Sequence, residues 1–481
     1  MKTRILPLFL VATLLAPLPL IKAATPPGLL AGTAVVDITP DVFPMQLRSG
    51  PSKYVHDPLH VRAVALQNGE RRAVLAVVDA IGVGRDWTDE AKSVVAERTG
   101  WKPEHMLVCG THTHTAPKGG DTSPGRIAYQ TKRREGLVEA LTRAIQSLEP
   151  AKVGYASDEE PTEVYNRRWF LKEGTMDKNP LDGFDQVRTN APRQHLLKPA
   201  GPTDPQVCVI DVRTRRGRPL GLLANYALHY VGGMPSVVEA NGKEVGMASA
   251  DYFGEFCRVM PYRIGGSNPP QNFVAMMTNG ASGDINNIDF DGRRPPRAPF
   301  EQVRVVATKT ADAAWRAVRK IENYADNPTL AILQREVTIH YRKPSEEDVQ
   351  RARQLMTLSR KQRDAINKRC SSVVEHVLRA ADEETSPQSV MVQALRIGDQ
   401  AIVSMPFEVL VEIGLEIKRA SPFPRTFLIS LANGSHGYLP PPHQHQLGGY
   451  ETWFTSAHFA EDTSVILTRN LLQMLAELKS L

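Results

Sequence analysis

The chain has 481 residues, of which 58 are Lys or Arg and 52 are Asp or Glu, so its formal net charge at pH 7 is only +6. Charges that nearly balance argue against the cationic surface of a nucleic-acid-binding protein, and we expect no nucleic-acid partner. The length is ample for a large hydrophobic core, whereas four cysteines are too few for a disulfide scaffold.

The first 24 residues have the pattern of a secretory signal peptide. A basic start precedes an apolar run over residues 5–21, and small residues follow near Ala24. The alternative is an uncleaved anchor, which Pro17 and Pro19 disfavour because they interrupt the apolar run. No later stretch approaches the roughly 18 apolar residues of a spanning helix. We therefore expect export to the periplasm or the extracellular space after cleavage near Ala24, and no transmembrane segment in the mature chain.

The first third of the chain alternates between strand and helix patterns. Strands are predicted at residues 30–38 and 62–81, the second as a hairpin that turns at Gly69-Glu70. Helical spacing occurs at 87–98 and 134–148, and the apolar run Met106–Val108 between them predicts a further strand. This alternation indicates an α/β (α+β) protein with mixed β-sheets flanked by helices and an active site at the strand ends.

The rest of the chain continues the same alternation with two exceptions. Residues 150–205 read as an irregular surface excursion, and the very polar segment 344–383 is predicted to be a solvent-exposed helical hairpin or arm. Further strands are predicted at 207–212, 220–226, 273–278, 390–405 and 426–431, and further helices from Asp251 and at 300–323, 409–419 and 457–478. Because no repeat or low-complexity linker divides the chain, we expect residues 25–481 to form a single domain.

Two histidines at the end of a predicted strand start the candidate site. His112 and His114 are spaced i, i+2, which places both imidazoles on one face of an extended segment. Other polar residues that follow apolar strands are His229, Asp284, Glu408 and the region of Tyr438. A hydrolytic zinc centre needs three or four N/O ligands, and two histidines, a glutamate and a tyrosine would supply them.

Each of these residues also has an interpretation without a metal. The first two histidines would be polar loop residues, His229 a hydrogen-bonded core histidine, and Glu408 a partner for a helix N-terminus. A metallophosphoesterase pattern is disfavoured because the Gly-x-Thr-His stretch precedes Gly283-Asp284 and no Asp-x-His opens the series.

A series of short motifs resembles the neutral/alkaline, non-lysosomal ceramidases, in the same order and over essentially the whole chain after residue 24. The motifs are Gly32-Thr-Ala-Val-Val-Asp37-Ile-Thr-Pro40, Thr111-His-Thr-His-Thr-Ala-Pro117, Asn166-Arg167, Asp204-Pro-Gln-Val, Asn225-Tyr-Ala-Leu-His229, Ser249-Ala-Asp251-Tyr-Phe-Gly254, Gly283-Asp284, Pro406-Phe-Glu408 and Gly437-Tyr438 with Tyr450-Glu451.

The resemblance implies a zinc-dependent amidase that cleaves an N-acyl bond. It implies His114 as a second active-site histidine that protonates the departing amine, and Arg167 as the group that holds the carbonyl oxygen. Position by position, it implies zinc ligands at His112, His229, Glu408 and Tyr438, and substrate contacts at Asp284, Asn286 and Tyr450. Tyr450 lies in the same loop as Tyr438 and is the alternative for its role.

Two departures from the family bear on the substrate. Asn286 stands where the family has a serine, so we expect no serine nucleophile there. The chain ends at Leu481, soon after Glu451, and we expect no C-terminal β-sandwich domain.

The expected partner is a small-molecule or lipid N-acyl substrate, which is compatible with transient contact with a membrane surface. The sequence leaves the oligomeric state open. The alternatives are a hydrolase of the same fold for another amide or ester, for example carbohydrate-derived, and a zinc-stabilised secreted binding protein without turnover.

Overall fold

A computed structural model describes residues 28–118, 123–232, 236–292, 294–298, 300–384 and 386–481. The predicted signal peptide, residues 1–24, lies outside these residues. Within them, no helix is both long and apolar enough to cross a bilayer. All four cysteines lie in the described part of the chain and are free thiols.

The largest element is a mixed eight-stranded sheet. Its inner pairs are antiparallel, while the outermost pair at each end, β13 with β16 and β5 with β6, is parallel. The strand order is β16 (Val274–Asn279), β13 (Pro219–Tyr226), β12 (Gln206–Thr214), β7 (Glu149–Glu159), β1 (Leu29–Asp37), β4 (His60–Asn68), β5 (Arg71–Val78) and β6 (Met106–Gly110). The predicted hairpin is confirmed, because β4 and β5 join at Gly69, whose φ of 58° suits a residue without a Cβ.

A second, four-stranded sheet packs on one face of the first. Its strands lie in the order β18 (Leu330–Ile339), β19 (Gln388–Ile397), β20 (Gln400–Ser404) and β22 (Arg425–Ile429). One hydrophobic cluster joins side chains from both sheets, among them Leu75, Leu223, Leu395 and Phe427. The two sheets therefore form the middle layers of the molecule.

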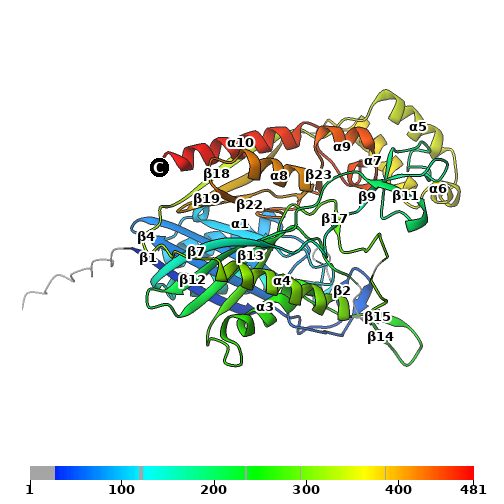
Figure 1. The fold of residues 1–481 in the computed structure, drawn as a ribbon. Coiled ribbons are helices and arrows are strands. Elements are labelled where there is room, and N and C mark those ends of the chain that lie inside the picture. The colour runs from blue at the N-terminus through cyan, green and yellow to red at the C-terminus, as the bar shows by residue number, and fades with distance from the viewer. Residues whose placement is uncertain (1–27, 119–122, 233–235, 293, 299, 385) are drawn as a thin grey trace, which may run out of the picture.

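Helices cover the outer face of each sheet. The larger sheet packs against α1 (Arg85–Thr99), α2 (Pro124–Gln146), α3 (Asp251–Gly265) and α4 (Glu301–Arg319). The smaller sheet packs against α8 (Val411–Ala420) and α10 (Thr463–Lys479). Figure 1 shows this order of layers, with α8 and α10 on one side and α3 and α4 on the other. The predicted α/β class with mixed sheets flanked by helices is confirmed.

Two stretches differ from the sequence prediction. Residues 150–205, expected to be irregular, contain β7 of the large sheet and a small sheet of β10 (Val187–Thr189), β9 (Arg168–Leu171) and β11 (Leu196–Pro199). The strand β18 also has no counterpart in the prediction. The sequence of β7 contains small and polar residues such as Gly154 and Ser157, so its local preference for a strand is weak. The segment is nevertheless a strand because it pairs with β12 along nearly its whole length.

The polar segment 344–383 forms three helices, α5 (Glu346–Met356), α6 (Arg360–Ile366) and α7 (Cys370–Asp382). Ser345 and Ser359 each cap a helix with a reciprocal capping box, which satisfies the free backbone N–H groups. The helices bury a separate cluster that includes Val349, Val374 and Phe454. They lie near β9 and β11 at one end of the molecule (Figure 1).

Short elements connect these layers around the strand ends. They are β2 (Met45–Leu47), β3 (Gly50–Ser52), β8 (Tyr165–Asn166), β14 (Ser236–Val238), β15 (Glu244–Gly246), β17 (Ile285–Asn286), β21 (Glu408–Val409), β23 (Tyr438–Leu439), α9 (Pro442–Leu447) and the 3-10 turns η1 (Pro103–His105), η2 (Arg193–His195) and η3 (Tyr450–Thr452). β2 pairs with β3, β14 with β15, β17 with β8 and β21 with β23.

Candidate metal centre

The loops that follow β6 and β13 bring three histidines together. His112 and His114 follow β6, and His229 follows β13, although these strands lie towards opposite ends of the eight-stranded sheet. Nε2 of His112 lies 2.9 Å from Nε2 of His229 and 3.1 Å from Nε2 of His114. One ring nitrogen from each of the three lies within 4.8 Å of the others, so that the group could hold a metal ion.

Glu408 brings a carboxylate to the same point from β21. Its Oε2 lies 3.3 Å from Nε2 of His112 and 3.6 Å from Nε2 of His229. This oxygen is buried and has no hydrogen-bond partner among the described residues. An isolated carboxylate oxygen inside a protein is costly unless a cation or a donor compensates it.

The hydrogen bonds of Nδ1 in His112 and His229 show which nitrogen of each ring carries the hydrogen. Nδ1 of His112 lies 2.6 Å from the carbonyl oxygen of Ile81, and Nδ1 of His229 lies 3.0 Å from that of Ser282. A carbonyl only accepts, so each Nδ1 donates and each neutral ring keeps a lone pair on Nε2. Backbone carbonyls commonly orient metal-binding histidines in this way.

These observations together fit a cation. Two imidazole lone pairs and one carboxylate oxygen without a hydrogen bond converge here, and a positive charge between them would relieve their mutual repulsion. A set of N and O donors of this kind suits Zn²⁺. His112 also has a φ of 75°, a conformation that is rare for a residue with a Cβ and that is concentrated at functional sites.

In His114 the Nδ1 atom accepts a hydrogen bond, whereas in His112 and His229 it donates one. Nδ1 of His114 lies 2.8 Å from NH1 of Arg48, in the turn between β2 and β3. A guanidinium group only donates, so Nδ1 accepts and the neutral ring carries its hydrogen on Nε2, which faces His112. Burial lowers the pKa of His114, and the neighbouring His112 and Arg48 lower it further. The ring also stacks on Tyr230, with 3.6 Å between centroids.

Arg167 and Tyr438 lie beside this group. NH2 of Arg167 donates to the Tyr438 hydroxyl at 3.0 Å and to the carbonyl of Gly283 at 2.6 Å. Burial raises the pKa of Tyr438 well above its usual value, although the positive charge of Arg167 opposes the shift. The structure thus brings together His112, His114, His229, Glu408, Tyr438 and Arg167, as predicted from the sequence.

Glu451 orients Arg167 and had no role in the sequence analysis beyond its place in a motif. Its fully buried carboxylate accepts from Nε of Arg167 and from NH1 of Arg168, each at 2.8 Å, and from Oγ1 of Thr189 at 2.6 Å. Burial raises the pKa of this carboxyl, but the two arginines outweigh it and leave the pKa lowered. The adjacent pair Arg167-Arg168 was the only signal in the sequence that a buried acid had to exist nearby.

The three predicted substrate contacts have different surroundings. Asp284 accepts from the backbone N–H of Val411 at 2.8 Å and from Nδ2 of Asn166 at 2.9 Å, so both carboxylate oxygens are bonded inside the protein. Nδ2 of Asn286 donates to Asn190 at 2.6 Å. Tyr450 packs edge-on against Tyr438, with 5.6 Å between ring centroids. Contact between these residues and a substrate stays a prediction.

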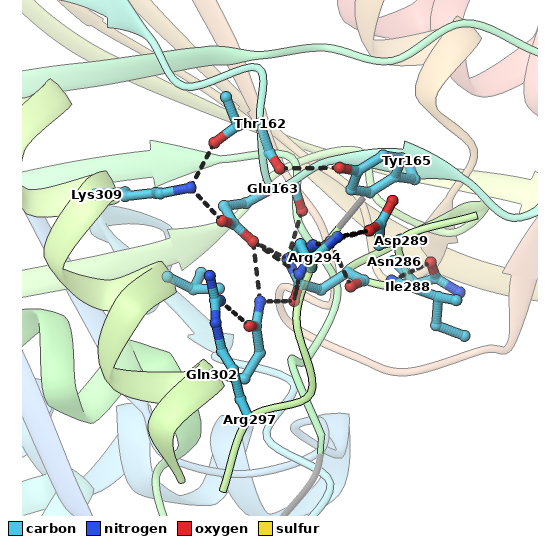
Figure 2. A network of polar contacts seen from close by, with 12 residues as sticks. Thr162, Glu163, Tyr165, Asn286, Ile288, Asp289, Arg294, Arg297, Gln302 and Lys309 are labelled. Atoms are coloured by element: carbon cyan, nitrogen blue, oxygen red, sulfur yellow. Dashed lines mark hydrogen bonds and ion pairs between the residues drawn. The ribbon is translucent and has the colours of Figure 1, made fainter. Parts of the chain in front are cut away.

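A buried network holds the loop that follows Asn286. The carboxylate of Glu163 accepts from Asn287 at 2.8 Å, from Arg294 at 3.0 Å, from Gln302 at 2.9 Å and from Lys309 at 2.5 Å. Figure 2 shows Arg294 from the loop and Gln302 and Lys309 from α4 converging on Glu163. The network fixes the loop to α4 and thereby keeps the turn at Asp284 in place.

Comparisons with known proteins connect this geometry to a fold. No family model and no curated protein matches the chain. Among solved structures, neutral ceramidase from Pseudomonas aeruginosa is similar with a TM-score of 0.69 and 16% identity, over 95% of this chain and 75% of that one. A ceramidase complexed with C2 is similar with the same score and identity, over 94% and 75%. The chain therefore has the fold of the neutral ceramidases.

Proposed function

We propose that this chain is a zinc-dependent amidohydrolase that cleaves an N-acyl bond. The observation that carries the proposal is the convergence of two Nε2 lone pairs, from His112 and His229, on the unpartnered buried oxygen of Glu408. The likeness to neutral ceramidases supports a hydrolase and suggests an amide substrate. Export through the N-terminal segment is part of the proposal.

The zinc ion would be held by His112, His229 and Glu408, with the nearby Tyr438 as a fourth ligand. When bound, zinc supplies a Lewis acid for the carbonyl oxygen and makes water a nucleophile at neutral pH. The carbonyls of Ile81 and Ser282 fix the two rings so that their lone pairs face inward.

Arg167 would stabilise the negative charge that develops on the carbonyl oxygen of the substrate. Its guanidinium is held by Glu451 and Gly283, so it need not reorganise as the charge forms. The site is therefore prepared for the transition state before a substrate arrives.

His114 would protonate the departing amine. An amine leaves poorly unless it receives a proton, and a well-placed general acid contributes roughly 10²- to 10⁴-fold to the rate. Because Nδ1 accepts from Arg48, the ring hydrogen is on Nε2 and faces the centre. The proton that the attacking water gives up would replace the one that Nε2 passes to the amine, so the ring would remain neutral over the cycle. The proposal thus gives different tasks to His112 and His114, which are two positions apart in the sequence.

The proposal is tested by incubating purified protein with ceramide and with a panel of other N-acyl compounds. We expect release of free fatty acid or of another carboxylate, loss of this activity on chelation and its return with zinc. His114→Ala should abolish turnover while retaining zinc, whereas His112→Ala should lose both. Turnover that survives complete removal of metal would contradict the proposal.

A further inference from the structure

A cavity of about 890 Å³ is lined by charged, aromatic and aliphatic residues, among them Tyr450. Its walls come from residues 176–179, from Asp185 and residues 187–189, from residues 364–368 at the end of α6, and from Gly449, Tyr450 and Trp453. The volume is in the range of pockets that bind small molecules. Tyr450 packs against Tyr438 of the centre and also against Trp453, with 5.8 Å between the latter centroids. Tyr450 therefore contacts the centre through Tyr438 and also forms part of the cavity wall.

The charges that line the cavity balance. The acidic residues are Asp177, Asp185 and Asp364, and the basic residues are Lys178, Arg188 and Lys368. Arg188 forms an ion pair with Asp177, and Asp185 accepts from Nε1 of Trp453 and from the backbone N–H of Gly449, both at 2.9 Å. Equal numbers of opposite charges offer no net attraction to an anion or to a cation.

An alkyl chain is a poor match for the same walls. A chain that filled the cavity would remove water from charged groups on several sides and return no hydrogen bonds, which is costly. Trp453 nevertheless offers an apolar ring to the cavity, whereas Arg369 lies over the Tyr450 ring at 5.7 Å from its centroid. A ligand that suits both features has many hydroxyl groups, no net charge and apolar C–H faces.

We infer that this cavity binds a neutral, polyhydroxylated part of the substrate, of the kind that a carbohydrate provides. The inference rests on the proposed function, since it places the scissile N-acyl bond at the metal centre and the polyhydroxylated part beyond Tyr450. The hydroxyl groups would donate to carboxylates such as Asp364 and accept from cations such as Lys368. The substrate class is then a carbohydrate-bearing amide in place of plain ceramide.

The test uses a substitution that fills the cavity without touching the centre. Ala365 lines the cavity and is exposed, so Ala365→Trp should occupy the space and leave the fold intact. The control is Gln354→Trp, at an exposed position on α5 that does not line the cavity. Circular dichroism and the melting temperature verify that both variants are folded.

Binding is measured by calorimetry with cellotriose, maltotriose and N-acetylchitotriose as neutral sugar probes. We expect at least one to bind the wild type and the Gln354→Trp variant, with at least tenfold weaker binding to Ala365→Trp. Binding of none of the three, or equal binding to Ala365→Trp, would overturn the inference. The first two sugars carry no amide, so their binding does not depend on turnover and should persist in His112→Ala even if the proposed function fails.

A kinetic measurement distinguishes two sources of the sugar. The kcat/KM values for an N-acylated oligosaccharide and for a glycosylceramide in detergent micelles are compared with that for ceramide. We expect one sugar-bearing substrate to exceed ceramide by tenfold or more, with the advantage lost in Ala365→Trp and kept in Gln354→Trp. A preference for ceramide that Ala365→Trp leaves unchanged would show that the cavity has no part in substrate choice.

Discussion

One hydrogen bond distinguishes His114 from the other two histidines of the centre. His112 and His229 donate from Nδ1 to backbone carbonyls, whereas His114 accepts at Nδ1 from Arg48. Spacing in the sequence predicts that His112 and His114 share one face of an extended segment, but both lie in the loop after β6, where His112 has a φ of 75°. The spacing also carries no information about the partner of each Nδ1. The different roles proposed for them therefore depend on contacts that only the fold creates.

Replacing Arg48 with methionine should release this constraint. Without the guanidinium donor, the His114 ring can place its hydrogen on either nitrogen, so that fewer molecules present a proton to the leaving amine. We expect kcat to fall roughly 10- to 100-fold, part of the contribution of a general acid. KM and the zinc content should change little.

The matched control for Arg48→Met is Lys53→Met, an exposed cation just after β3 that stacks near Tyr54. Both substitutions remove one positive charge from the same part of the surface. If the two variants had the same kcat, Arg48 would act only through its positive charge and not through its hydrogen bond to His114.

Asp251 gives a prediction for the pH dependence of stability. It is fully buried at the start of α3 and accepts from the backbone N–H groups of Val231 and Gly232, just after His229. Burial raises the pKa of this carboxyl to about 7, despite these hydrogen bonds. The unfolded chain therefore ionises first, and the free energy of unfolding should decrease as the pH rises from about 4 to about 7.

The measurement is chemical denaturation of the wild type and of Asp251→Asn between pH 4.5 and 7.5. We expect the wild type to lose on the order of 1 to 4 kcal/mol more than the variant over this range. The difference between the two curves removes the contribution of other carboxyls, such as Asp57. Parallel curves would mean that Asp251 has an ordinary pKa in the folded protein.

At the scale of elements, the strands that could be predicted were those with long apolar runs. The strands β5 and β13 are buried along most of their length, and each has the continuous apolar run that is typical of a buried strand. The strand β7 could not be predicted because its partner β12 lies about 50 residues away and supplies the pairing that its own residues only weakly favour. Similarly, the polarity of 344–383 concealed the small cluster that its three helices bury.

The start of α8 depends on Asp284. This carboxylate accepts from the N–H of Val411, the first residue of the helix, and from Asn166. Asp284→Ala would leave the buried N–H of Val411 without a partner, at a cost of about 1 to 3 kcal/mol, and would remove one of the two hydrogen bonds that Nδ2 of Asn166 donates. We expect a loss of about 2 to 4 kcal/mol in the free energy of unfolding, measured by urea denaturation.

A suitable control for Asp284→Ala is Glu416→Ala, at an exposed position on the same helix. An exposed substitution of this kind normally changes stability by no more than about 0.5 kcal/mol. If Asp284→Ala were as stable as this control, the turn at Gly283-Asp284 would have no structural role in starting α8.

At the scale of the molecule, the centre joins the two sheets. His112 and His229 follow strands of the larger sheet, whereas Glu408 and Tyr438 belong to β21 and β23, in the part of the chain that forms and covers the smaller sheet. The strand ends could be predicted from the sequence. Their meeting point could not, because β6 and β13 are separated by five strands in the sheet order, and the sequence does not show that the loops after them meet.

The central claim is that His112, His229 and Glu408 hold one zinc ion. The most direct test is the zinc content of purified wild type, His112→Ala and Glu408→Ala, measured by mass spectrometry of the metal after dialysis against a weak chelator. We predict one zinc per chain in the wild type, little zinc in either variant, and a lower melting temperature where zinc is lost, because a ligand that binds only the folded state stabilises it. Stoichiometric zinc in both variants would contradict the account.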